Sequence, residues 1–156
     1  MKGPGSLAAG VCLALVLASS GESGVARGSS TPGPARGVSG VVSFQRDVAP
    51  VLVASCATRS CHGGGSRPPV LAARDGVRKL RVALVGVASE ERPGRAYVHP
   101  GDPDASYLMQ KIEGHLVDAE CADRDCGEPM PLDNPSLSAD ARRTIRAWIA
   151  QGARDN

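Results

Sequence analysis

The chain of 156 residues is predicted to be an all-α protein with long loops, and three observations favour this class. Apolar residues recur at helical spacing in four separate segments. No segment shows the strict alternation of apolar and polar residues that is typical of a half-buried strand. The segments between the expected helices are rich in Gly and Pro, which favour turns and loops.

The first 40 residues are expected to lie outside the folded domain. Residues 1–20 have the pattern of a signal peptide, with one early positive charge, an apolar run and small residues at its end. Residues 21–40 are mostly Gly, Ser and Pro and form no apolar face, so they are interpreted as a flexible linker. The folded domain is therefore expected to span residues 41–156.

Attachment to a membrane is expected only through an uncleaved signal or a lipid anchor. The apolar run is too short for a comfortable membrane span. Cys12 lies inside this run, but the residue before it is Val11, whereas a lipoprotein site needs a small residue there. Cleavage of the signal is therefore favoured over lipidation, and we expect the domain in the periplasm or cell envelope.

The first helix is expected over residues 47–57. Asp47 is a good N-cap, and Pro50 falls in the first turn, where a missing N–H costs little. The helix leads directly into Cys56. The Gly-rich and Pro-rich residues 62–69 that follow are predicted to form neither helix nor strand.

Three further helices are expected. The apolar spacing predicts the second over residues 74–86 and a third, shorter one over residues 104–113. The last helix is the clearest: Ser138 is its N-cap, and Gly152 ends it. One apolar stripe of this helix is formed by Ala141, Ile145, Trp148 and Ile149.

The candidate site begins with two cysteines and a histidine. His62 directly follows Cys61, and four residues separate Cys61 from Cys56. Two cysteines with a His after the second are typical of covalent haem c attachment, in which the thiols bind the haem and the imidazole binds its iron. The usual spacing is two residues, so the two extra ones are expected to loop outward. The Gly residues after His62 are expected to let the backbone approach the porphyrin closely.

Met130 is the candidate for the second axial ligand of the iron. It lies between two prolines, which stiffen the backbone and present a side chain at a fixed angle. A thioether opposite a His raises the reduction potential and is typical of electron transfer. His99 and His115 remain alternatives for this position. Met109, inside an expected helix, is interpreted as a core residue.

The remaining cysteines are expected to form a disulfide. Five cysteines are an odd number for an exported protein, but four remain without Cys12. Cys121 and Cys126 have the same spacing as the first pair but no following His, so a second haem is not expected. A local disulfide there would make the loop that carries Met130 more rigid.

Composition and charge exclude several function classes. The 18 Lys and Arg nearly balance the 16 Asp and Glu and are scattered, so no nucleic-acid partner is expected. No P-loop, dinucleotide fingerprint or Ser/His/Asp pattern is present, so the chain is not expected to be an enzyme. Aromatic residues make up only 3% of the chain, which leaves open a core of small aliphatic residues or a buried cofactor that supplies apolar volume.

Taken together, these motifs resemble a class I-like bacterial cytochrome c domain of the exported monohaem type. The resemblance covers about residues 43–154. It rests on Phe44 to Pro50 leading to Cys56, the cysteine-histidine motif, Pro100 to Pro103 with Ser106 and Leu108, Pro129 to Pro131, and the segment from Leu137 to Ala153. It implies a cytochrome c-like fold in which the N- and C-terminal helices cross around one haem. In that arrangement Trp148 and Ile145 would meet Val48, Val51 and Leu52, and the carbonyl of Pro68 or Pro69 would accept the proton of His62.

The resemblance further implies a function in electron transfer. One covalent haem c would be held by Cys56 and Cys61, with its iron bound by His62 and Met130. The partners would be redox proteins, and the domain is expected to be a monomer. The alternative is an exported module without haem, either stapled by two disulfides or binding zinc through its Cys and His residues.

Overall fold

The all-α class is confirmed for the part of the chain that the computed structural model describes, residues 38–132 and 136–156. Within these ranges four α-helices occur with short 3₁₀ and π-helical turns, and no strand is present. Extended pairing is limited there to two isolated bridges, Val85 with Val98 and Ala88 with Ala96. Long loops therefore connect the helices, as the Gly and Pro content predicts.

The expected signal peptide, residues 1–20, lies outside the described residues, and so does the expected linker up to residue 37. The described residues all belong to a single compact unit. None of the helices in that unit is long and apolar enough to cross a membrane.

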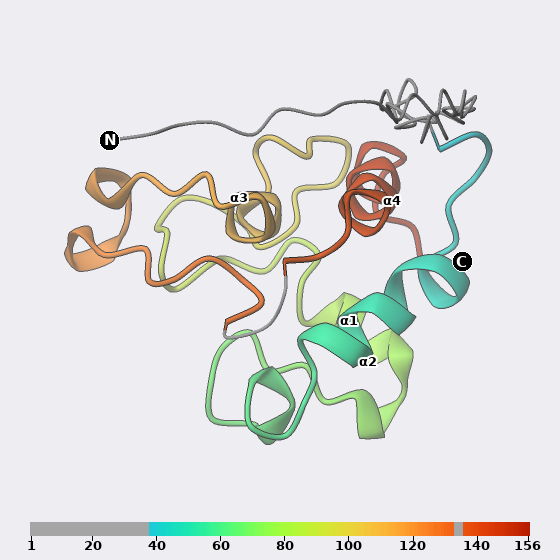
Figure 1. Cartoon of the computed structure of the whole chain (residues 1–156), viewed down its shortest axis with the longest axis horizontal. Helices are drawn as coiled ribbons and strands as arrows, with labels where there is room; N and C mark the ends of the chain where they lie inside the picture. Colours follow the sequence, from blue (N-terminus) through green and yellow to red (C-terminus); the bar gives the residue numbers. More distant parts are fainter. Residues whose placement is uncertain (1–37, 133–135) are drawn as a thin grey trace, which may run out of the picture. The chain divides into compact units, whose positions relative to one another are not determined.

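The first helical segment begins earlier than expected (Figure 1). A π-helical turn, η1 (Phe44–Val48), runs directly into α1 (Ala49–Ser55). The hydroxyl of Ser43 accepts a hydrogen bond from the amide of Arg46, and the carboxylate of Asp47 accepts one from the amide of Ser43 at 2.8 Å. Asp47 therefore closes the first turn from inside the helix, because Ser43 holds the N-cap position.

The two middle helices are shorter than predicted. A 3₁₀ turn, η3 (Ala73–Asp75), precedes α2 (Val77–Val82), because Gly76 between them has a φ of 97° that a helix does not allow. The next helix, α3 (Tyr107–Glu113), begins after Ser106. The Ser106 hydroxyl accepts a hydrogen bond from the amide of His99 at 2.9 Å, so it closes the preceding turn and does not cap the helix.

The last helix, α4 (Ala139–Ala150), has the limits that its sequence predicts. The hydroxyl of Ser138 accepts a hydrogen bond from the amide of Ala141 at 3.1 Å, as an N-cap does. Gly152, with a φ of 93°, follows the helix and turns the chain. The buried face of α4 consists of Ile145, Trp148 and Ile149.

α4 packs against the beginning of the first helical segment. The contact is made by Phe44, whose ring centroid lies 5.1 Å from that of Trp148. Val48 and Leu52 belong to the same buried core, whereas Val51 is only partly buried. The expected meeting of the first and last helices is thus centred earlier in the chain than predicted, because η1 adds a turn that contains Phe44.

Polar contacts also fix the residues before η1 against the end of α4. The side-chain oxygen of Gln151 accepts a hydrogen bond from the amide of Val42 at 2.8 Å, and its amide group donates to the carbonyl of Gly40 at 3.0 Å. The side-chain oxygen of Asn156 accepts from the amide of Phe44 at 3.0 Å. These bonds satisfy donors at a helix start that would otherwise lack partners.

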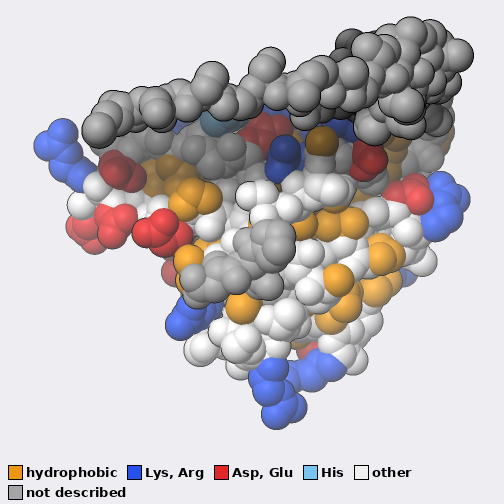
Figure 2. All heavy atoms as spheres, viewed as in Figure 1, with side chains coloured by type: hydrophobic (Ala, Val, Ile, Leu, Met, Phe, Trp, Pro, Cys, Tyr) orange, Lys and Arg blue, Asp and Glu red, His pale blue; other side chains and the backbone are white. Residues whose placement is uncertain are grey.

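The surface separates apolar and acidic regions. Figure 2 shows hydrophobic side chains gathered over α1, and acidic side chains over the two 3₁₀ turns η4 (Asp118–Glu120) and η5 (Ala122–Arg124). A hollow beside α1 is lined mainly by apolar residues, namely Pro50, Val51, Ala54, Pro131, Leu137 and Ala141. Several acidic side chains of this face thus lie on the loop that contains the second cysteine pair.

Replacing Ser138 by Ala should lower the free energy of unfolding by about 1 kcal/mol, because the amide of Ala141 loses its acceptor. Urea denaturation followed by circular dichroism measures the change. Ser136→Ala, an exposed serine just before the cap, is the control and should change stability by less than about 0.5 kcal/mol. Equal stabilities of the two variants would contradict the capping role.

Candidate functional site

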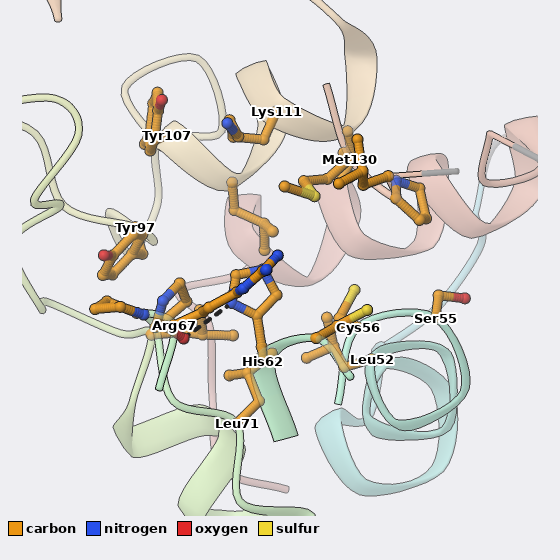
Figure 3. A pocket seen from close by; sticks show the side chains of 18 of the residues that line it. Leu52, Ser55, Cys56, His62, Arg67, Leu71, Tyr97, Tyr107, Lys111 and Met130 are labelled. Atoms are coloured by element: carbon orange, nitrogen blue, oxygen red, sulfur yellow. Dashed lines mark hydrogen bonds between the residues drawn. The ribbon is translucent and has the colours of Figure 1, made fainter. Parts of the chain in front are cut away.

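A single cavity brings together all four residues that the sequence analysis selected. Cys56, Cys61, His62 and Met130 line a cavity of about 340 Å³ (Figure 3). This volume lies in the range of small-molecule and cofactor sites. The rest of its wall is mostly apolar and includes Leu52, Pro68, Pro69, Leu71, Leu84, Leu108, Ile112 and Pro131.

His62 and Met130 reach the cavity from opposite sides (Figure 3). His62 begins the 3₁₀ turn η2 (His62–Gly64), which follows the first helix, whereas Met130 lies on the long loop before α4. The amide of Met130 donates a hydrogen bond of 2.9 Å to the carbonyl of Lys111 on α3. An imidazole and a thioether from distant parts of the chain therefore face one cavity.

The orientation of His62 is fixed by a carbonyl group, but not by the one that was expected. Nδ1 of His62 lies 3.2 Å from the carbonyl oxygen of Arg67, the residue just before Pro68. Pro68 and Pro69 line the cavity instead. With its proton on Nδ1, His62 donates to Arg67 and keeps a lone pair on Nε2 for a ligand in the cavity.

The first cysteine pair lies where α1 ends. The amide of Cys56 donates to the carbonyl of Leu52 at 2.9 Å, and the amide of His62 donates to the carbonyl of Cys56 at 3.1 Å, so the loop between the cysteines folds back on itself. Both cysteines carry thiols. Burial, with a smaller effect of the neighbouring Cys61, raises the pKa of the Cys56 thiol to about 11, so this thiol is protonated at neutral pH.

The glycines after His62 make room for this loop. A Cβ atom on Gly63 would collide with the carbonyl of Ala57, and one on Gly64 would collide with the carbonyl of Arg59. The side chain of Arg59, in the loop between the cysteines, is exposed, as expected for a loop that points outward. The backbone of this loop packs onto Gly63 and Gly64. These two glycines therefore allow a close approach of the chain's own backbone, and their expected approach to a porphyrin stays a prediction.

One wall of the cavity has polar groups that the sequence analysis did not select. Tyr97, Tyr107, Lys111 and Glu91 line it together. Tyr107 is almost fully buried, and its hydroxyl donates to Glu91 at 2.8 Å. Burial and this hydrogen bond raise the pKa of Tyr107, so its hydroxyl stays protonated. One sequence signal could have indicated this wall: aromatic residues are scarce in the chain, and both of its tyrosines lie here.

The alternative ligands are not placed at this cavity. His99 and His115 are exposed, and neither is among the residues that line it. His115 instead borders a second hollow, on the side where Met130 also lies. Met109 is buried in the core, as expected. Of the candidates for a second ligand, Met130 is thus the one that shares the cavity with His62.

The second cysteine pair forms the expected disulfide. Cys121 and Cys126 are bonded, with their Cα atoms 5.2 Å apart. The turn η4 comes just before their loop, η5 lies inside it, and the loop ends four residues before Met130. Within the described ranges, no group of three or more His, Cys, Asp or Glu side chains is arranged to hold a metal ion. The zinc-binding alternative therefore gains no support from the geometry.

The residues around the cavity fit a haem c group. Two thiols, an imidazole and a thioether face one apolar space, which is the donor set that covalent attachment and axial ligation need. Apolar walls also favour a largely apolar ligand. The cavity therefore combines ligand chemistry and polarity that suit this group.

No protein-family model, no curated protein and no solved structure matches the chain. The class of site is therefore inferred from the chemistry and placement of its residues.

Replacing Gly63 by Ala should lower the free energy of unfolding by about 2–3 kcal/mol, because the new Cβ collides with the carbonyl of Ala57. Gly65→Ala is the matched control: its φ of 86° disfavours Ala by about 1–2 kcal/mol, but the space around it is open. Denaturant unfolding of both variants measures the difference. A smaller loss for Gly63→Ala than for Gly65→Ala would contradict the packing of the loop on the glycines.

Proposed function

We propose that this chain is an exported c-type cytochrome with one haem, which transfers single electrons between redox protein partners. The observation that supports the proposal most strongly is the shared cavity of Cys56, Cys61, His62 and Met130. The expected signal peptide favours export to the periplasm or cell envelope, where c-type haem is attached.

Each of the four residues has one role in this proposal. Cys56 and Cys61 attach the haem through thioether bonds, His62 is the proximal ligand, and Met130 is the distal ligand. When bound, the haem supplies an iron that alternates between the ferrous and ferric states. The protein holds this group, orients it and keeps water away from it.

The surroundings of His62 and Met130 would adjust the reduction potential. The carbonyl of Arg67 accepts the Nδ1 proton of His62, which makes the imidazole a stronger ligand. The thioether of Met130 and the apolar wall both favour the ferrous state and raise the potential. The site is thus suited to accept an electron readily and to release it to a partner.

The helical packing supports a cytochrome c-like fold. The contact of Phe44 with Trp148 joins the first helical segment to α4, as the resemblance implies for the N- and C-terminal helices. The His-containing turn lies after the first helix and the Met-containing loop lies before the last one. The proposed ligands His62 and Met130 thus come from separate segments, which reach the cavity from opposite sides.

Haem should remain on the protein after denaturation if the chain is produced together with a haem c maturation system. Haem staining of the denatured protein measures this. Cys61→Ala and His62→Ala should each reduce stable haem incorporation at least tenfold, because each removes an anchor. The control is the double variant Cys121→Ala, Cys126→Ala, which removes the pair that has the same spacing but no following His. This variant should keep its haem. Absence of haem from the parent protein would overturn the proposal.

Replacing Met130 by Leu should leave the haem attached but lower the reduction potential, on the order of 0.1 V, because the thioether ligand is lost. Met109→Leu is the control, since it removes a core thioether at nearly constant volume. Redox titration followed by absorbance measures both potentials. Equal potentials in Met130→Leu and the parent would exclude Met130 as the distal ligand.

A further inference from the structure

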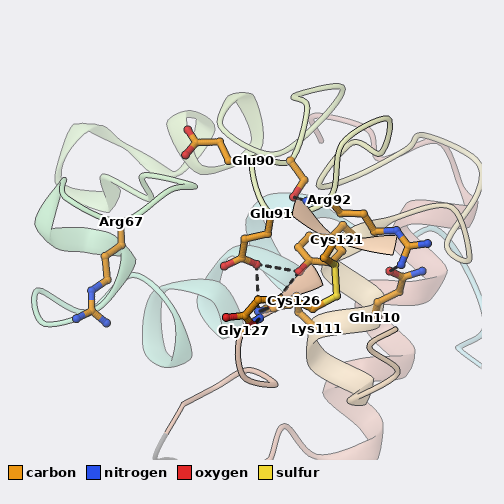
Figure 4. A network of polar contacts seen from close by, with 12 residues as sticks. Arg67, Glu90, Glu91, Arg92, Gln110, Lys111, Cys121, Cys126 and Gly127 are labelled. Carbon is orange, nitrogen blue, oxygen red and sulfur yellow. Dashed lines mark hydrogen bonds and ion pairs between the residues drawn. A yellow bond between two sulfur atoms is a disulfide. The ribbon is translucent and has the colours of Figure 1, made fainter. Parts of the chain in front are cut away.

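Lys111 is a buried cation in the wall of the cavity (Figure 3) and belongs to a network of polar contacts (Figure 4). Its side chain is only 8% exposed. The ammonium group donates to the carbonyl of Cys126 at 2.7 Å and lies 3.1 Å from the carboxylate of Glu91. It also lies 5.7 Å from the centre of the Tyr107 ring, one helical turn away on α3. A buried charge is tolerated only when it is paired and hydrogen-bonded, and Lys111 has both kinds of partner.

The main chain of Lys111 has a second contact, with Met130. Its carbonyl accepts the hydrogen bond from the Met130 amide at 2.9 Å. Pro129 and Pro131 have no N–H, so the amide of Met130 is the one main-chain donor of this tripeptide. The tripeptide therefore uses its one amide to bind α3.

Lys111 thus holds the segment from Cys126 to Met130 at both ends. Its side chain binds the first residue of the segment, and its main chain binds the last. Tyr107 lies beside the first attachment: its hydroxyl, which donates to Glu91, also lies 3.1 Å from the carbonyl oxygen of Cys126. Glu91 pairs with Lys111, and its own carbonyl accepts from the amide of Ala122 at 2.9 Å, inside the disulfide loop.

We propose that Lys111 is the positioning residue for Met130: it fixes both ends of the Cys126–Met130 segment on α3 and so holds the thioether at the cavity. The consequence for an iron ligand rests on the proposed function, but the positioning itself does not. A charged donor suits this role, because hydrogen bonds from charged groups are about twice as strong as neutral ones. The disulfide fixes the loop before the segment, and Lys111 connects that loop to the helix.

The test replaces Lys111 by Met in the full matured chain, with Lys79→Met as the matched control. Lys79 is exposed on α2, so the control makes the same chemical change away from the cavity. In Lys111→Met the half-exposed Glu91 remains accessible to water and keeps the hydroxyl of Tyr107 as a donor, so the variant is expected to fold.

The first readout is hydrogen exchange of the Met130 amide, measured by NMR. Protection of this amide should fall roughly tenfold or more in Lys111→Met and stay unchanged in Lys79→Met. Tyr107→Phe, which removes the hydroxyl that holds Glu91 beside Lys111, should lower protection by a smaller factor and is informative even if Lys111→Met folds poorly. The proposal would be overturned if protection of the Met130 amide is unchanged in Lys111→Met. If only Tyr107→Phe folds, unchanged protection in that variant would overturn it.

The second readout separates this inference from the proposed function. In ferric protein with attached haem, the near-infrared band of Met–iron ligation should weaken in Lys111→Met and persist in Lys79→Met, while both keep their covalent haem. A parent protein that takes up no haem would contradict the proposed function, and Met130 exchange would still decide the role of Lys111. A full-strength band in Lys111→Met would count against the positioning of the thioether.

Discussion

The apolar cavity between His62 and Met130 is the constraint on which the described fold depends. Its walls are mostly apolar, so a group that fills it and bonds to both sides would bury their surface and stabilise the folded chain. Folding and binding of such a group are therefore expected to be coupled.

The chain uses its few aromatic residues at two places that serve this cavity. Phe44 and Trp148 join the first helical segment to α4, and Tyr97 and Tyr107 form part of the cavity wall. The helices thus form a shell, and the ligand-bearing segments are attached to it by specific hydrogen bonds. His62 is held by the carbonyl of Arg67, and Met130 is held by α3.

Local signals determined what could be predicted from the sequence. The limits of α4 at Ser138 and Gly152 could be predicted because capping and a positive φ act within one helical turn. The apolar spacing of the second helix predicted a longer helix than is present, because the positive φ of Gly76 ends the helical conformation there. His62 and Met130 were recognisable from adjacent residues. Lys111 was not, because its role depends on Glu91 and Cys126, which approach it only in the folded chain. The same holds for Arg67, since the carbonyl that faces His62 depends on the path of the backbone.

The proposed function requires one haem bound covalently at the first cysteine pair and none at the second. Mass spectrometry of the matured protein, intact and after proteolysis, distinguishes these arrangements. The proposed function predicts an intact mass increased by one haem, with the added mass on the peptides that contain Cys56 and Cys61. A haem-free mass, or haem on the peptides that contain Cys121 and Cys126, would contradict it.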